Sequence, residues 1–419
     1  MKWLAKLHHP EYYVKTFLKW LFLSLVVGIT GGLLGAGFHH ALHFVTHVRA
    51  EHQWLIFLLP VGGLLTVAIY HVLRMPKNRG TNEIIDAILE KKPVGPMVAP
   101  AVFLASAVTH LFGGSAGREG AALQIGGSVA SKLGDLFHLK DHNRTILVTC
   151  GMSAVFAGLF GTPLTATIFC MEFVSVGTLF TPALLPCYLS AFFASRISGL
   201  LGVHAETFFL ETAAGLNIAN IGGTVALALL VSVLGIAMCQ MFHTAEHLAA
   251  HHLHNRCVRI ALGGAVVTVM TLLVGDQRFN GAGMDMAMEA LGGTADWYSF
   301  LLKMLFTAVT LAAGFKGGEI VPTFCIGATF GCVVGGLLGL DPGIAAALGL
   351  IGLFCCATNS PLASIILSVE MFGTANLYLF ALVCVICFVL SGTGGLYASQ
   401  IIEYEKIDRY LVPDKEIKD

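Results

Sequence analysis

The sequence Gly113-Gly114-Ser115-Ala116-Gly117-Arg118-Glu119-Gly120-Ala121 interrupts an apolar region and is followed by a run of small residues. Glycines permit an irregular backbone whose N–H groups point into a cavity, and a helix that begins there adds the positive end of its dipole. At membrane depth, such backbone is tolerated only where it faces protein or water. We therefore interpret this stretch as one half of an anion-binding site.

A second glycine-rich helix start follows about 200 residues later, at Ala313-Gly314-Phe315-Lys316-Gly317-Gly318-Glu319-Ile320-Val321-Pro322. In this alignment Gly117-Arg118-Glu119 is paired with Gly317-Gly318-Glu319. Other landmarks repeat in the same order: Leu34-Gly35 with Leu234-Gly235, His43 with His243, and Pro163-Leu164 and Glu172 with Pro361-Leu362 and Glu370. If each half holds an odd number of membrane segments, the second half is inverted and the two helix starts converge on a site between the halves.

The composition is that of a membrane protein. The chain has 419 residues, of which 56% are hydrophobic and 12% charged, with a net charge of −1 and a mean hydropathy of +0.79. Soluble domains carry about 25% charged residues, and this charge excludes nucleic-acid binding. Apolar stretches long enough to cross a bilayer, together with shorter, Gly-interrupted ones, predict an all-α polytopic membrane protein with tilted and discontinuous helices.

The pattern also predicts the division of the chain. Lys2, Lys6, Lys15 and Lys19 precede the first apolar run, so we expect residues 1–19 to stay on the cytoplasmic side. We predict a first membrane repeat over 20–202, a linker over 203–219 and a second, inverted repeat over 220–400. A short charged tail then follows over 401–419.

The cysteines and histidines favour neither a disulfide framework nor a metal site. The eleven cysteines are scattered through apolar segments, so we interpret them as packed small hydrophobic residues. Histidines cluster after the first span and after its repeat, and their i, i+4 spacing is compatible with a divalent metal. A membrane metalloenzyme would also need a nucleophile or a general base at a recognisable spacing, and the sequence supplies neither. We predict no cofactor, no metal and no enzymatic activity.

Glu119 is the residue that we expect to act as the gate. An intramembrane carboxylate is costly unless it has a function, and Glu119 could occupy the anion position when charged and leave it when protonated. The alternative is that Glu119 caps its own helix and pairs with Arg118. Arg118 and Lys316 could each attract anions or neutralise a neighbouring glutamate. Glu172 and Glu370 occupy equivalent positions, which favours a structural role at helix ends.

At these residues the chain resembles the CLC family of anion channels and transporters. Gly117-Arg118-Glu119-Gly120-Ala121 is similar to the G(K/R)EGP gating motif of that family, with Ala121 in place of proline. Gly317–Pro322 is similar to the GxFxP motif, with Glu319 in place of phenylalanine, and Tyr397 falls where a pore tyrosine is expected. The resemblance implies an inverted repeat, a homodimer with one pore per subunit, and a location in the cytoplasmic membrane of a prokaryote.

The resemblance also implies the site residues. The gating and proton-transfer residues are Glu119 and Glu319. The expected anion-binding residues are Gly80, Thr81, Asn82, Gly117, Arg118, Gly120, Gly318, Ile320, Val321 and Tyr397. The GSGIP motif of the family corresponds to Arg79-Gly80-Thr81-Asn82-Glu83-Ile84, which lacks the serine, so Thr81 or Asn82 is expected to donate the hydrogen bond instead.

Two further departures bear on the transported ion. Phe173 stands where chloride/proton exchangers of the family carry an internal glutamate. The fluoride-exporting branch is similar in lacking that glutamate and in having one at the position of Glu319, although it usually has threonine where Val321 stands. We therefore expect proton-coupled halide antiport, with fluoride favoured over chloride. A passive chloride channel and a chloride/proton antiporter remain alternatives.

Overall fold

The computed structural model describes residues 10–75, 79–208, 210, 214–403 and 406. The first half of the described chain contains α1 (Pro10–Glu51), η2 (Gln53–Leu58), α2 (Leu59–Val72), α3 (Thr81–Leu89), α4 (Val98–Leu111), α5 (Glu119–Leu136), α6 (Asp141–Phe160), α7 (Pro163–Glu172), β1 (Ser175–Val176), η3 (Thr181–Ala183) and α8 (Leu184–Leu200). The second half contains α9 (Ile218–His252), α10 (Arg256–Val274), α11 (Met284–Leu291), α12 (Ser299–Ala313), α13 (Ile320–Leu337), α14 (Pro342–Thr358), α15 (Pro361–Phe372), α16 (Leu377–Leu390) and β2 (Ile401–Ile402).

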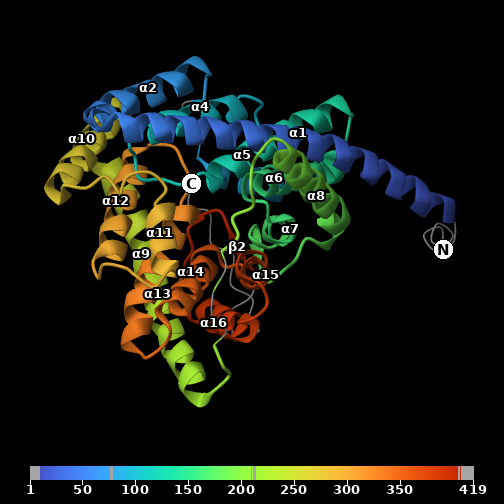
Figure 1. Cartoon of the computed structure of the whole chain (residues 1–419). Coiled ribbons are helices and arrows are strands. Elements are labelled where there is room, and N and C mark those ends of the chain that lie inside the picture. The colour runs from blue at the N-terminus through green and yellow to red at the C-terminus, as the bar shows by residue number, and fades with distance from the viewer. Residues whose placement is uncertain (1–9, 76–78, 209, 211–213, 404–405, 407–419) are drawn as a thin grey trace.

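The chain is an all-α bundle with helices of very different lengths, as the sequence predicts. Helix α1 runs across the top of the view in Figure 1, and α13 to α16 lie below it. The boundary expected between residues 19 and 20 falls inside α1, a continuous helix of 42 residues. The N-terminal segment and the first repeat therefore share one helix. The linker was predicted over 203–219, but it ends at residue 217 in the structure because α9 begins at Ile218.

The outer surface is apolar. Phe44, Val72 and Leu273 have exposed fractions of 66%, 76% and 82%. Within the described residues, seven helices are long and apolar enough to cross a membrane, and shorter apolar helices such as α4, α12 and α14 accompany them. Side chains of this kind face lipid at no cost but would be unfavourable in water. The structure thus agrees with a polytopic membrane protein.

Small residues let the helices next to each glycine-rich start pack closely. A Cβ atom on Gly126 of α5 would lie 2.1 Å from the carbonyl oxygen of Gly151 in α6. The second half repeats this contact, because a Cβ on Gly327 of α13 would lie 2.5 Å from the carbonyl oxygen of Gly349 in α14. The spacing of small residues every four positions therefore serves backbone-to-backbone packing.

Glu172 and Glu370 exchange helix caps between the halves, which confirms the structural role predicted for them. The carboxylate of Glu370, near the end of α15, accepts the backbone N–H groups of Leu164 and Thr165 at 3.0 and 2.8 Å. The carboxylate of Glu172, at the end of α7, accepts those of Leu362 and Ala363 at 3.0 and 2.8 Å. Each negative charge lies at the positive end of the opposite helix dipole.

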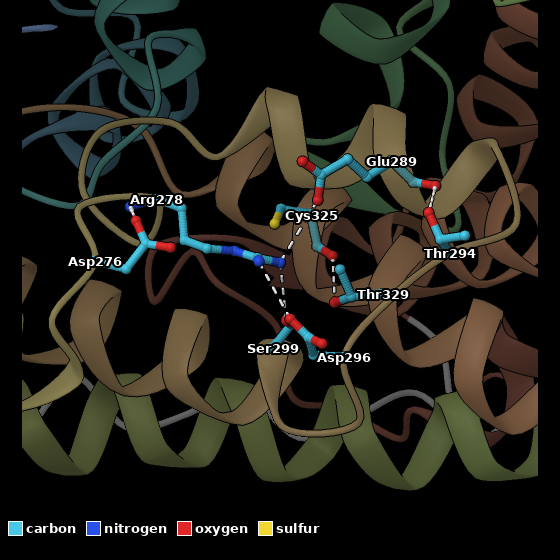
Figure 2. Close-up of polar contacts among 8 residues, drawn as sticks. All are labelled: Asp276, Arg278, Glu289, Thr294, Asp296, Ser299, Cys325 and Thr329. Atoms are coloured by element: carbon cyan, nitrogen blue, oxygen red, sulfur yellow. Dashed lines mark hydrogen bonds and ion pairs between the residues drawn. The ribbon is translucent and has the colours of Figure 1, made fainter.

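The remaining features of the core agree with the sequence. All eleven cysteines are free within the described chain, and all except Cys257 are buried, as expected for packed small hydrophobic residues. The parallel pairing of β1 with β2 joins the segment that carries Tyr397 to the end of α7. Arg278 joins the loop before α11 to Asp296, Ser299 and Glu289 (Figure 2).

Candidate anion and proton site

The two glycine-rich helix starts meet at the centre of the molecule. Gly117 and Gly318 form an antiparallel bridge in which each backbone N–H donates to the other carbonyl oxygen, at 2.6 and 2.7 Å. Helices α5 and α13 begin at Glu119 and Ile320, directly after this bridge. Gly117 therefore corresponds to Gly318, one position later than the sequence alignment predicted. In this register Glu319 is the counterpart of Arg118, and Glu119 has no carboxylate counterpart.

The bridge requires glycine because the two chains touch. A Cβ atom on Gly318 would lie 2.9 Å from the backbone nitrogen of Glu119 and 2.8 Å from that of Gly120. A Cβ on Gly117 would lie 2.4 Å from a carboxylate oxygen of Glu119. The absence of side chains at Gly117 and Gly318 thus leaves room for the carboxyl group of Glu119 between the two helix starts.

The carboxyl group of Glu119 occupies the position where backbone donors converge. The side chain is fully buried, and Oε2 accepts the N–H groups of Arg118 and Val321, each at 3.1 Å. Oε1 is buried and has no hydrogen-bond partner among the described residues. An anion of similar size could replace this carboxylate on the same donors, which is the arrangement expected of a gate.

The side chain of Arg118 points away from Glu119. Its guanidinium group pairs with the carboxylate of Glu206, donates from Nη1 to His39 Nδ1 at 3.3 Å, and lies over the ring of Phe160. The guanidinium group forms its ion pair with Glu206 and not with Glu119, but the opposite charges of Arg118 and Glu119 attract each other, so the alternative in which Arg118 neutralises Glu119 stays a prediction. Arg118 contacts Glu119 through its backbone N–H only.

Glu319 faces a large cavity on the other side of the bridge. We call this cavity the vestibule: it has a volume of about 800 Å³ and is lined by residues that include Thr81, Asn82, Lys316, Glu319 and Tyr397. Oε2 of Glu319 is buried and has no hydrogen-bond partner among the described residues. Glu119 does not line the vestibule, so the two carboxyl groups have different surroundings.

Thr81 is the hydroxyl that lies next to the bridge. It is the first residue of α3, directly after Gly80 with φ +67°, and a Cβ on Gly120 would lie 2.9 Å from its Oγ1 and 3.6 Å from Glu319 Oε2. Thr81 is thus the candidate whose hydroxyl group lies beside the bridge. Asn82 also lines the vestibule, but its Oδ1 accepts the backbone N–H of Ser399 at 3.0 Å. Asn82 therefore holds the segment that carries Tyr397.

Tyr397 lines the vestibule and carries a hydroxyl group that could donate a hydrogen bond. The residue is 5% exposed, and its Oη has no hydrogen-bond partner among the described residues. Its ring lies edge-to-face with Phe173, at a centroid distance of 5.5 Å. Phe173 is fully buried and stacks on Phe169 at 4.8 Å, so this position carries no proton.

Ile320 and Val321 contribute main-chain groups to the site. Both side chains are buried, and the N–H of Val321 is one of the two donors to Glu119. A valine side chain cannot donate a hydrogen bond to an anion, so the donors near this position come from the backbone, Thr81 and Tyr397.

Charges in the vestibule favour anions. Arg79, Arg256, Arg259 and Lys316 line it, against the two carboxylates of Glu246 and Glu319. Arg79 is paired with Asp86 at 2.7 Å, and Lys316 Nζ lies 5.1 Å from the ring centroid of Tyr70. A cavity with an excess of one sign raises the local concentration of the opposite ion.

Sequence reasoning missed Lys303 and Gln124. Lys303 is fully buried, and its Nζ donates to Ser115 Oγ at 3.0 Å and to the carbonyl oxygens of Phe279 and Gly281 at 3.1 and 2.7 Å. It thereby supports the loop before Glu119. Gln124 lines the vestibule and donates to the carbonyl oxygen of Gly120 at 2.9 Å. Lys303 is the single charged side chain of the apolar helix α12, and this isolation is the signal that could have identified it. Gln124 carries no such signal, because α5 also contains Ser128, Lys132 and Asp135.

The histidine clusters hold no metal site in the part of the chain that the structure describes. His39 stacks on His43, and His247 on His251, at centroid distances of 6.4 and 6.2 Å. His39 also contacts Arg118, and His243 Nε2 donates to the carbonyl oxygen of Gly395 at 2.7 Å. These contacts tie His39 to the start of α5 and His243 to the loop between α16 and β2.

Comparisons with known proteins agree with this geometry. The sequence profile of the "Voltage gated chloride channel" family matches residues 62–392. The chain is 32% identical to the "Chloride/fluoride channel protein" of Pseudomonas syringae pv. tomato, over 99% of this chain and 94% of that protein. It is 26% identical to the "H(+)/Cl(-) exchange transporter ClcA" of Vibrio campbellii, over 94% of this chain and 88% of that protein. The solved structure of a "CLC-type fluoride/proton antiporter" superposes with a TM-score of 0.89 at 31% identity, covering 92% of this chain and 98% of that one.

Proposed function

Because the chain belongs to the voltage-gated chloride channel (CLC) family and is a CLC-type anion transporter or channel, we propose that it exchanges fluoride for protons across the membrane. The observation that carries this proposal is the pair of carboxyl groups on either side of the Gly117–Gly318 bridge. Glu119 accepts hydrogen bonds from backbone N–H groups that suit an anion, and Glu319 faces the vestibule with an Oε2 that none of the described residues binds.

Glu119 is the gate in this proposal. When ionised, its carboxylate competes with the anion for the N–H groups of Arg118 and Val321. When protonated, it loses most of its affinity for these donors and leaves the position to the anion. Binding an anion therefore requires a proton on Glu119, and this requirement couples the two movements.

Glu319 favours fluoride over chloride. Fluoride is small and strongly hydrated, so it needs strong hydrogen-bond donors, and a protonated carboxyl group is one. Thr81 Oγ1, Tyr397 Oη and a protonated Glu319 would together replace part of the hydration shell. An ionised Glu319 would repel the same anion, so proton and fluoride would arrive through overlapping positions.

Val321 supports the second candidate, a chloride/proton antiporter or passive chloride channel. Its side chain offers a soft apolar wall, which suits the weakly hydrated chloride better than fluoride. Phe173 removes the internal proton carrier of chloride/proton exchangers, so a chain that uses chloride would be expected to work as a channel.

The test is efflux from proteoliposomes loaded with equal fluoride and chloride, with the external pH recorded. The proposal expects fluoride to leave faster than chloride, with proton uptake in a fixed ratio. Glu119→Gln should leave at most passive anion movement, and Glu319→Gln should lose both proton uptake and the fluoride preference. Glu90→Gln, on an exposed glutamate paired with Lys92 at 2.6 Å, is the matched control. Chloride leaving as fast as fluoride without a pH change would refute the proposal.

We also propose that the chain forms a homodimer with one pore per subunit in the cytoplasmic membrane of a prokaryote. The exposed apolar faces of α7, α8, α15 and α16 support a subunit contact; they include Leu164, Leu185, Tyr188, Leu362 and Tyr378. Cross-linking in detergent and native mass measurement test the dimer. Membrane fractionation tests the location.

A further inference from the structure

The first part of the linker, residues 203–208, brings a carboxylate to Arg118 outside the residues that line the vestibule. The backbone N–H of Glu206 donates to the carbonyl oxygen of Phe160, at the end of α6, at 3.1 Å. That of Phe208 donates to the carbonyl oxygen of Met371, near the end of α15, at 2.7 Å. The linker is thus fixed to both halves of the molecule and carries the side chain of Glu206 to the site.

Glu206 reaches the guanidinium group of Arg118, which is adjacent to the gate in the sequence. The side chains of Arg118 and Glu206 are 16% and 19% exposed, so the pair is only partly accessible to solvent. One carboxylate oxygen of Glu206 binds Arg118 Nη2, and the other is buried without a hydrogen-bond partner among the described residues. A guanidinium group in such a setting is a strong site for an anion.

The other contacts of Arg118 leave that anion position intact. Arg118 donates from Nη1 to His39 Nδ1, and because arginine cannot accept a hydrogen bond, His39 carries its proton on Nε2 in this arrangement. The ring of Phe160 lies 5.2 Å from the guanidinium carbon and contributes no acceptor in the guanidinium plane. The anionic acceptor on Arg118 is the Glu206 carboxylate.

We propose that Arg118 is a second anion site, on the linker side of the gate, and that Glu206 masks it. The Glu206 carboxylate occupies the guanidinium group that a small monovalent anion would otherwise bind on its way to or from Glu119. Glu206 is therefore a positioning residue that sets the anion affinity on this side. The inference rests on the proposed function only through anion transport, and neither proton coupling nor ion identity enters it.

Replacing the Glu206 carboxylate with a neutral group leaves the positive charge of Arg118 unpaired on the linker side of the gate. An unpaired unit charge lowers the free energy of a nearby anion, and the effect is several times larger near protein than in water. We expect Glu206→Gln to lower the concentration of anion at half-maximal transport about tenfold. Proteoliposomes contain both orientations, so the uptake curve acquires a high-affinity component from molecules whose linker side faces the bath.

The experiment measures initial fluoride uptake, and separately chloride uptake, against concentration at constant pH in full-length protein. Glu289→Gln is the matched control, because Glu289 also lies beside an arginine, Arg278, at 3.5 Å and outside this site (Figure 2). The control should keep the half-saturation concentration of the unmodified chain. In an Arg118→Gln background, Glu206→Gln should have no further effect, because the mask acts through Arg118.

A Glu206→Gln variant that transports with an unchanged half-saturation concentration would overturn the proposal. So would an equal shift in the Arg118→Gln background, since Glu206 would then act independently of Arg118. If Glu206→Gln does not transport, calorimetric titration of the purified variant with fluoride and with chloride decides: about tenfold tighter binding supports the mask, and unchanged binding refutes it. A wild-type chain without proton uptake would contradict the proposed antiport but would leave this comparison valid.

Discussion

Replacing Gly318 with alanine tests whether the bridge between the helix starts holds the gate. The added Cβ would lie 2.9 Å from the backbone nitrogen and 2.9 Å from Oε2 of Glu119, and 2.8 Å from the nitrogen of Gly120. Ordinary contacts begin at 3.4 Å, so these atoms must move by about half an ångström. Gly318 does not have positive φ, so the effect comes from contact and not from backbone strain.

The size of the effect follows from this displacement. Overpacking of this kind costs about 1–3 kcal/mol, and two of the three clashing atoms belong to the backbone and cannot rotate away. Misplacing a functional group by about 1 Å can reduce a rate about 100-fold, so half that shift at Glu119 should reduce transport about tenfold. The thermal unfolding midpoint in detergent should fall by a few degrees.

The assay compares anion efflux from proteoliposomes for Gly318→Ala and Gly336→Ala. Gly336 lies in the same helix, but the nearest atom to its Cβ would be Pro342 Cγ at 3.8 Å. The control should transport normally and gain up to about 1 kcal/mol of stability, because alanine favours the helix. Equal transport by both variants would show that the close contact at Gly318 does not position Glu119.

Three further outcomes follow from single side chains. Tyr397→Phe removes a hydroxyl that has no hydrogen-bond partner among the described residues, so it should leave the unfolding midpoint unchanged and raise the half-saturation concentration for the anion about fivefold. A lower midpoint would show an unrecognised partner. Lys303→Met leaves three buried acceptors without the Lys303 donor and should destabilise the chain by at least about 2 kcal/mol. Thermal unfolding in detergent measures this loss, and an unchanged midpoint would contradict it. Glu172→Gln should lower the free energy of unfolding by about 1.5–3 kcal/mol. This loss should exceed that of Glu370→Gln, because Glu172 is the more buried of the two caps, and equal losses would contradict this.

Much of the fold could be predicted, because a membrane-spanning helix is recognised from the residues of one continuous segment. Apolar length, small-residue spacing and the glycine-rich helix starts depend on neighbouring residues, so they were readable without the structure. The reciprocal caps of Glu172 and Glu370 were also foreseen as structural, because their symmetry is visible in the sequence. The eleven cysteines likewise pack as small hydrophobic residues.

The register of the repeat was wrong by one residue at the site. Sequence alignment paired Glu119 with Glu319, since matching glutamates is the simplest alignment of the two motifs. The backbone bridge instead pairs Gly117 with Gly318, so Glu319 corresponds to Arg118. The helix starts at Glu119 and Ile320 and the close contacts of Gly126 and Gly327 have the same register as the bridge, whereas the glycine-rich segments alone change little on a one-residue shift.

By itself, the sequence determined that this is a membrane protein with two related halves and a carboxylate at a glycine-rich helix start. Tertiary structure alone decided which groups meet: Arg118 with Glu206, Asn82 with Ser399, and Lys303 with Ser115. The physical reason is that spans and helix starts are properties of continuous segments. The partner of a buried charge is chosen by whichever distant segment the packing brings within hydrogen-bond distance.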